Sequence, residues 1–344
     1  MKQEQHLLSK GPLLDEEGNL VEAGYAYSLV KSYSRKAIKA NKSRIKEWDY
    51  YYIGNNNYGI ALTIDDNSYM DLCSVSLLDF RTGTYLEKMV THPFSGGKRN
   101  LPSSSEEGDT VYLDKKVTMK FLHEGDLRHI FCVFPKFGKK GETLKVDITL
   151  KETCDNSMVI ATPFLKKGHF YYNQKINNLL AHGYVKLGDE LLDFSLDTYG
   201  VLDWGRGVWT YENTWYWSSF NSKVGDRIIG WNLGYGFGDT SKASENMLFI
   251  DEKAYKLNDV TFEIPKKKNG KDDYLSPWVL SSKSGDIHLK FTPILDRHGG
   301  ANLGLFVSDQ HQVFGTWEGY FLLDEKKIEI TGQVGFAEKV FNRW

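Results

Sequence analysis

The chain contains 344 residues, a length that fits two domains or one large all-β domain. Its 43 lysines and arginines nearly balance 45 aspartates and glutamates, so the formal charge of −2 gives no electrostatic case for nucleic acid or a membrane surface as a partner. Aromatic side chains make up 14% of the residues, and 32 glycines stand against 8 prolines. Because aromatic residues favour strands and glycines favour turns, we expect an all-β protein.

The N-terminal segment and the cysteines bear on cellular location. Residues 1–19 lack the apolar segment of a secretion signal, and nowhere do about 18 apolar residues follow one another. Cys73, Cys132 and Cys154 are far apart and form no C-x-x-C pair, which indicates reduced, inert thiols rather than a disulfide framework. We therefore expect a soluble cytoplasmic protein.

Short strand-like runs bounded by turn residues recur along the chain, whereas helical periodicity does not persist beyond about two turns. Residues 51–65 predict strand, Gly/Asn loop and strand, and residues 117–134 repeat this plan. Antiparallel meanders are the simplest connection, and closed barrels would remove their exposed edges. Further runs of this kind span residues 182–197, 227–237, 246–257, 259–264, 285–294 and 326–336.

A break in the strand pattern suggests a domain boundary. Within residues 162–175, Pro163, Gly168 and a lysine pair interrupt the alternation. We therefore predict an N-terminal domain at residues 1–165 and a C-terminal domain at residues 166–344.

Common catalytic and cofactor motifs are missing from the sequence. The nine histidines form no HExxH, HxH or HxxxH arrangement, so no local metal motif is present. The glycine-rich residues 234–239 match neither a dinucleotide fingerprint nor a P-loop, and no GxSxG elbow occurs. We therefore expect neither a metal nor a cofactor.

Residues 202–220 (LDWGRGVWTYENTWYWSSF) hold four tryptophans, two tyrosines, one aspartate and one arginine. In an extended strand alternate residues share a face, so Trp215 and Trp217 should point together and Tyr216 the other way. Two glycines flank Arg206 and predict a tight bend or bulge that re-aims Asp203 and Arg206.

Two interpretations of Asp203 follow. Beside Trp204, Trp209 and Tyr211 its carboxyl could be desolvated until it holds a proton near neutral pH and protonates a substrate. Alternatively, Asp203 and Arg206 form a structural ion pair while the tryptophans fill a barrel interior.

Four segments carry a family resemblance: residues 11–26 (GPLLDEEGNLVEAGYA), 44–53 (RIKEWDYYYI), 201–219 and 244–264. Together they resemble the DUF2804 family, with the DWGRG and WYW block as the most specific part. That family is distantly similar to the carotenoid hydratase, AttH and survival-factor group. The resemblance implies two lipocalin-like (calycin-type) antiparallel β-barrels packed side by side.

The same resemblance implies a site. Carotenoid hydratases use an acidic residue among aromatic side chains to protonate a carbon–carbon double bond, and aromatic faces stabilise the resulting cation. By analogy we predict Asp203 as general acid and Arg206 as its orienter or an anion clamp. The predicted substrate-binding residues are Trp204, Trp209, Tyr211, Trp215, Trp217, Asn232, Glu245 and Asn246.

Three functions remain open from the sequence. The first is a cofactor-independent hydratase, lyase, isomerase or cyclase that acts on a small, largely apolar molecule. The second is a carrier or sensor of a lipid or isoprenoid, because barrels of about eight strands can hold one small ligand without chemistry. The third is a glycan-directed enzyme, which would need a second carboxylate near the first.

Overall fold

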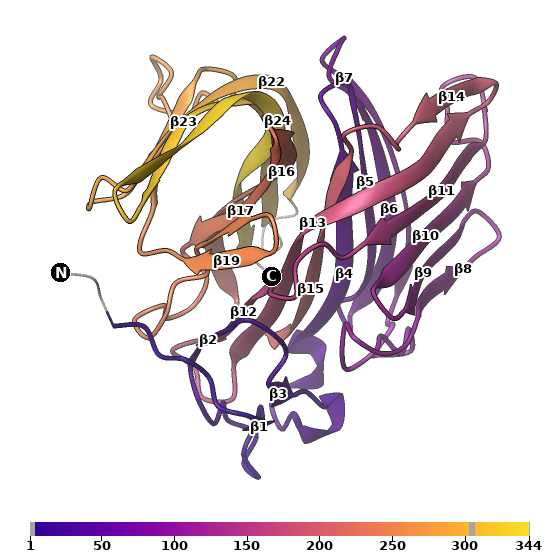
Figure 1. Ribbon diagram of the computed structural model, residues 1–344. Coiled ribbons are helices and arrows are strands. Elements are labelled where there is room, and N and C mark those ends of the chain that lie inside the picture. The colour runs from indigo at the N-terminus through magenta and orange to yellow at the C-terminus, as the bar shows by residue number, and fades with distance from the viewer. Residues whose placement is uncertain (1–3, 303–306, 344) are drawn as a thin grey trace.

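The computed structural model describes residues 4–302 and 307–343, which form two large antiparallel sheets. Figure 1 shows the sheets side by side, each strongly curled, with the chain in the first from indigo to pink and in the second from orange to yellow. The predicted all-β class is confirmed. None of the described helices is long and apolar enough to span a membrane. The helices within residues 4–302 and 307–343 are two short 3₁₀ turns, η1 (Arg35–Ala37) and η2 (Lys42–Arg44).

The first sheet contains thirteen strands among the described residues. Its main order is β7-β6-β5-β4-β15-β13-β11-β10-β9-β8, while β12 and β14 pair with β13 and β2 pairs with β12. The strands are β2 (Gly24–Ala26), β4 (Ile45–Gly54), β5 (Tyr58–Asp66), β6 (Met70–Asp79), β7 (Thr84–Pro93), β8 (Thr110–Leu113), β9 (Thr118–Glu124), β10 (Leu127–Phe134), β11 (Leu144–Lys151), β12 (Met158–Pro163), β13 (Phe170–Leu187), β14 (Glu190–Asp193) and β15 (Tyr199–Val208).

The second sheet contains nine strands within the described ranges, in the order β19-β18-β17-β16-β24-β23-β22-β21-β20. A separate parallel pair joins β1 (Gly11–Pro12) to β3 (Lys31–Ser32). The strands of the second sheet are β16 (Glu212–Val224), β17 (Arg227–Tyr235), β18 (Met247–Ile250), β19 (Lys253–Lys256), β20 (Thr261–Glu263), β21 (Trp278–Ser281), β22 (Ile287–Asn302), β23 (Val307–Leu323) and β24 (Lys326–Arg343).

The chain does not change sheet at residues 165 and 166, between which the sequence predicts a domain boundary. This position falls between β12 and β13, which pair with each other in the first sheet. The chain leaves that sheet only after Val208 and enters the second at Glu212. Pro163 and Gly168 therefore mark a hairpin connection rather than a change of sheet.

Alternation along β4 separates two environments. Tyr51 and Ile53 pack into the core enclosed by the first sheet, whereas Tyr50 and Tyr52 face the second sheet. The Tyr52 ring lies 5.1 Å from the ring of Phe314 on β23, centroid to centroid. The facing outer surfaces of the two sheets thus form an aromatic interface.

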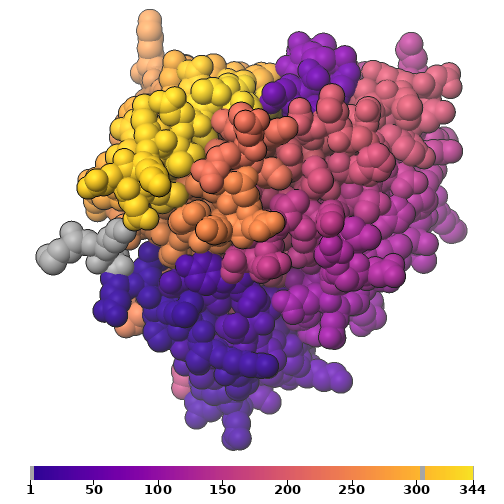
Figure 2. Space-filling model, viewed as in Figure 1, coloured from indigo at the N-terminus to yellow at the C-terminus, as the bar shows by residue number. Residues whose placement is uncertain are grey.

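Two further features tie the halves together. On β13 the register with β15 shifts between Ile176 and Leu179, and the amide of Asn177 in this bulge donates to the carbonyl oxygen of Trp231 on β17 at 3.0 Å. The backbone N–H of His6 donates to the carbonyl oxygen of Lys242 at 2.9 Å. Figure 2 shows the indigo N-terminal segment lying against both halves.

Candidate functional site

A cavity of about 470 Å³ lies between the two sheets, within the size range of ligand pockets. The first sheet contributes Trp48 and Tyr50 of β4 and Asp203 of β15, and the second contributes Gln312 of β23 and Glu338 of β24. Both sheets therefore build one shared pocket from their facing surfaces.

One part of the cavity wall is aromatic. The Trp209 ring lies edge-to-face with three neighbours, at centroid distances of 5.4 Å to Trp48, 5.7 Å to Trp215 and 4.9 Å to Phe237. Trp48 also stacks on Tyr171, with centroids 6.1 Å apart. Such packing holds the rings in defined orientations and gives this wall an apolar character.

Two donors hold the carboxylate of Asp203 on the cavity wall. Lys175 lies directly across from Asp203 on β13, and its Nζ is 2.8 Å from Oδ2. The Asn173 amide donates to Oδ1 at 2.6 Å. Both carboxylate oxygens therefore act as hydrogen-bond acceptors, one toward Lys175 and the other toward Asn173.

Lys175 links this pair to a second acid. Its Nζ lies 3.7 Å from the ring centroid of Trp217, whose indole N–H donates to Oδ1 of Asn232 at 2.6 Å. The amide of Asn232 in turn donates to Oε2 of Glu245 at 3.3 Å. Burial raises the pKa of Glu245, although Lys175 and Asn232 act in the opposite direction.

Glu338 is a further acid of the cavity, whose lining also includes Asp65 and Glu87. Its Oε1 accepts from the indole N–H of Trp215 at 2.8 Å and its Oε2 from the amide of Gln312 at 3.0 Å. Burial raises the pKa of Glu338 to about 7, against the opposing effects of Trp215 and the nearby Lys175. Glu338 therefore titrates near neutral pH inside a cavity that also holds aromatic faces.

Comparison with known proteins places the chain in a family. A family described as "Domain of unknown function (DUF2804)" matches residues 4–344. The chain belongs to the DUF2804 family. No curated protein sequence matches this DUF2804 protein.

Solved structures share the fold of the DUF2804 protein. Kievitone hydratase from Nectria haematococca is 14% identical with a TM-score of 0.52, covering 92% of this chain and 98% of its own. A putative AttH from Nitrosomonas europaea is 11% identical with a TM-score of 0.51, covering 90% of this chain and 97% of its own. CghA is 10% identical with a TM-score of 0.45, covering 98% of this chain and 97% of its own. The predicted lipocalin-like architecture is thereby confirmed, as is membership of the DUF2804 family.

The structure brings five of the predicted site residues to the cavity wall of the DUF2804 protein. Trp215 and Trp217 share a face of β16, as alternation predicts, while Tyr216 packs on the other side, against the core of the second sheet. The five residues are Asp203, Trp209, Trp215, Trp217 and Glu245.

Trp204 and Arg206 lie on the opposite face of β15, away from the cavity. The Trp204 ring belongs to the core of the first sheet, and the Arg206 guanidinium lies 4.3 Å from its centroid. Arg206 forms an ion pair with Asp49, Nη1 to Oδ1 at 3.0 Å. The predicted alternative of an Asp203–Arg206 ion pair is therefore wrong, because strand alternation sends the two side chains to opposite faces.

The predicted bend at the DWGRG segment is also wrong. Tyr199–Val208 runs as one strand, and its pairing with β4 keeps a constant register. Gly205 instead leaves room for the Trp48 ring, because a Cβ at Gly205 would meet Trp48 Cζ2 at 1.9 Å. This glycine permits a close packing of ring on backbone rather than a turn.

The remaining predicted residues lie outside the cavity lining. Tyr211 is exposed. Asn232 is buried next to the cavity wall, where it forms hydrogen bonds with Trp217 and Glu245. Asn246 accepts a hydrogen bond from the backbone N–H of Gly234 on β17 at 2.7 Å.

Sequence reasoning missed Lys175 and Glu338. Neither belongs to a local motif, because β13 and β24 contribute them from distant parts of the chain. Glu338 carried one usable signal, since it lies with Lys339 in a segment whose other residues, 334–337 and 340–341, are uncharged. Among the described residues, the group of side chains that could hold a metal ion, His298, Asp309 and His311, lies outside the cavity lining.

Proposed function

We propose that this DUF2804 protein is a cofactor-independent acid–base enzyme that acts on a small, largely apolar molecule, with hydratase, lyase, isomerase or cyclase chemistry. The observation that carries the proposal is Glu338, a buried acid with a pKa raised to about 7 that faces a cavity with an aromatic wall. A group that titrates near the working pH can donate a proton and regain it within one cycle.

The proposed reaction begins when Glu338 protonates a carbon–carbon double bond or an enol. The π electron pair forms the new C–H bond, and the adjoining carbon becomes a cation that the faces of Trp215 and Trp217 stabilise. Water adds to this cation in a hydration, a different proton leaves in an isomerisation, and a second double bond attacks before proton loss in a cyclisation. Lyase chemistry is the reverse of hydration.

The released proton goes to Asp203 in this scheme. The sequence-based hypothesis made Asp203 the donor and Arg206 its orienter. We assign the donor role to Glu338 instead because burial raises its pKa to about 7, whereas Asp203 forms an ion pair with Lys175. Lys175 replaces Arg206 as the residue that positions Asp203.

Fold similarity supports this class of function. Kievitone hydratase is a hydratase by name, and the structural match covers 98% of its chain. A partly aromatic cavity of about 470 Å³ also suits one small organic molecule.

The test is proton exchange with solvent. Untagged protein is incubated in D₂O with an extract of apolar metabolites, and mass spectrometry follows deuterium in each compound. We expect one compound to gain carbon-bound deuterium with the wild type and not with Glu338→Gln. Glu318→Gln, which alters an exposed carboxylate on β23 outside the cavity lining, is the matched control and should label like the wild type.

The other outcomes discriminate the alternatives. A stoichiometric ligand that leaves the protein unchanged and gains no deuterium contradicts the enzyme proposal and supports a lipid or isoprenoid carrier. Cleavage of a sugar in a parallel incubation with a mixture of glycans would support a glycan-directed enzyme. Equal labelling by wild type and Glu338→Gln would remove Glu338 from the proposed mechanism.

A further inference from the structure

Two histidines and two aspartates gather at the rim of the second sheet. Asp296 and His298 lie on β22, Asp309 and His311 on β23, and His298 is the direct cross-strand partner of His311. Side chains alternate between the faces of a strand, so Gln310, between the two β23 members, lines the cavity instead. The cluster thus occupies the face opposite to the cavity.

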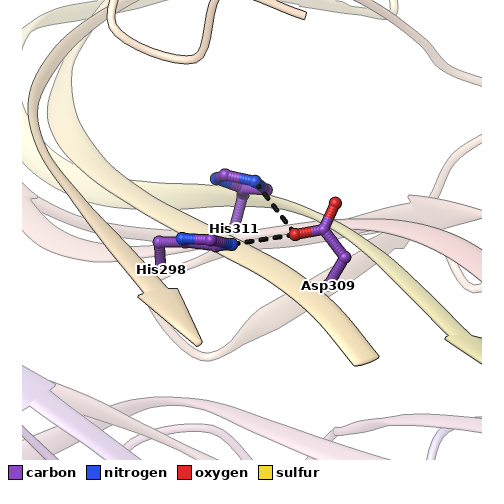
Figure 3. Close-up of side chains that lie close together, drawn as sticks. All are labelled: His298, Asp309 and His311. Carbon is purple, nitrogen blue, oxygen red and sulfur yellow. Dashed lines mark hydrogen bonds and ion pairs between the residues drawn. The ribbon is translucent and has the colours of Figure 1, made fainter. Parts of the chain in front are cut away.

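The spacing of three of these side chains suits a metal ion. Figure 3 shows both imidazoles directed toward the carboxylate of Asp309, whose Oδ1 lies 2.8 Å from Nε2 of His298 and 3.4 Å from Nε2 of His311. All three ligand atoms lie within 4.8 Å of one another. Ligands of tetrahedral Zn²⁺ with bonds of about 2.0–2.1 Å lie roughly 3.3 Å apart, close to this spacing.

Asp296 is a second and independent feature of the cluster. Its Oδ2 lies 2.7 Å from Nδ1 of His311, so the Nδ1–H of His311 donates to it. In a neutral His311 this hydrogen bond leaves the Nε2 lone pair facing Asp309. Histidine ligands of metals commonly donate their other ring N–H to a carboxylate, which fixes the tautomer and raises ligand basicity.

Charge balance favours a cation at the same point. In the described part of the chain, the ion-pair partners of Asp296 and Asp309 are the two histidines rather than lysine or arginine. With neutral histidines the cluster holds two negative charges, and the lone pair of His311 faces a carboxylate oxygen at 3.4 Å. Either added protons on the histidines or a bound dication relieves this repulsion.

We propose that His298, Asp309 and His311 bind a divalent transition-metal ion, with Zn²⁺ as the best match, and that Asp296 positions His311. Two imidazoles and one carboxylate suit Zn²⁺ and leave a fourth position for water. The side chain of His298 is 50% exposed, so its ring can turn from its stack on His311 to direct Nε2 at the ion. The ion would fasten β22 to β23, and this inference does not depend on the function proposed for the cavity.

The experiment uses untagged, chelator-treated full-length protein titrated with Zn²⁺ in a calorimeter and with Co²⁺ in a spectrophotometer. We expect one ion per chain, Co²⁺ absorption bands of a low-symmetry nitrogen and oxygen site, and a higher Tm with Zn²⁺. Asp296→Asn should lower Zn²⁺ affinity about 10–100-fold, and His298→Ala or His311→Ala should lower it further. His288→Ala, an exposed histidine elsewhere on β22, should bind like the wild type.

Three results would overturn the proposal. They are no Zn²⁺ binding by the wild type, equal binding by the wild type and the His298→Ala/His311→Ala variant, and loss of binding in His288→Ala alone. Far-UV circular dichroism of the metal-free variants separates lost ligands from lost fold. If His311→Ala does not fold, the more exposed His298→Ala still decides the question.

Discussion

Asp203 and Lys175 face each other across β15 and β13 as direct cross-strand partners, with Nζ 2.8 Å from Oδ2. Their side chains are only 11% and 4% exposed, so each charge depends on the other for compensation. The same lysine lies 3.7 Å from the ring centroid of Trp217. The ion pair of Asp203 and Lys175 and the aromatic ring of Trp217 therefore form one structural unit.

Replacement of Lys175 should destabilise the protein. Lys175→Met leaves Asp203 as an uncompensated buried charge, for which we expect a loss of about 3–5 kcal/mol in the free energy of unfolding. The double variant Lys175→Met/Asp203→Leu should lose less than the sum of its single variants, because both partners are then gone. Urea unfolding monitored by tryptophan fluorescence measures all four proteins. Additive losses would show that the pair does not act as a unit.

Arg206 should matter for stability and not for the chemistry of the cavity. Its buried guanidinium donates to Asp49 and to the carbonyl oxygens of Trp48 and Pro102. Arg206→Lys cannot reproduce this fork of donors, so we expect a loss of about 1–3 kcal/mol on urea unfolding. The folded fraction should retain the deuterium exchange of the wild type. A stable variant without exchange would instead return Arg206 to the catalytic role predicted from the sequence.

The segment from DWGRG to WYW shows which features of the site can be predicted from the sequence and which cannot. Alternation alone correctly places Trp215 with Trp217, because a strand has a fixed period of two. The roles of Gly205 and Arg206 depend on Trp48 and Asp49, which β4 supplies from another part of the chain. The spacing of glycines in the sequence cannot distinguish a β-bulge from a position where an aromatic ring packs on the backbone.

The acid–base set of the cavity shows the same limit. Asp203 was recognisable because aromatic residues surround it in the sequence, but Lys175 and Glu338 meet it only through sheet order and the packing of one sheet on the other. The pKa of Glu338 follows from its burial, a property of the folded chain. A resemblance to a family indicates the architecture without supplying these pairings.

Gly205→Ala tests the packing of the Trp48 ring on the backbone at Gly205. The added Cβ would meet the ring at 1.9 Å, so ring or strand must move, and we expect a loss of about 1–3 kcal/mol in the free energy of unfolding. Gly299→Ala is the matched control, since Gly299 also lies in a strand beside the cavity and a Cβ there meets no atom within 4 Å. Urea unfolding compares the two variants. Equal stability would mean that Trp48 moves aside without cost.

Glu338 should make stability fall as pH rises. Its pKa is raised from 4.5 to about 7 on folding, so the native state binds more protons than the unfolded state between these values. Its ionisation therefore imposes no penalty below about pH 4.5, and the penalty grows through pH 7 to a plateau of about 3 kcal/mol. Glu338→Gln lacks this titration, so the stability of the wild type relative to the variant should decline across that window. Urea unfolding at pH 5, 6, 7 and 8 measures the difference, and a constant difference would show that Glu338 titrates outside this range.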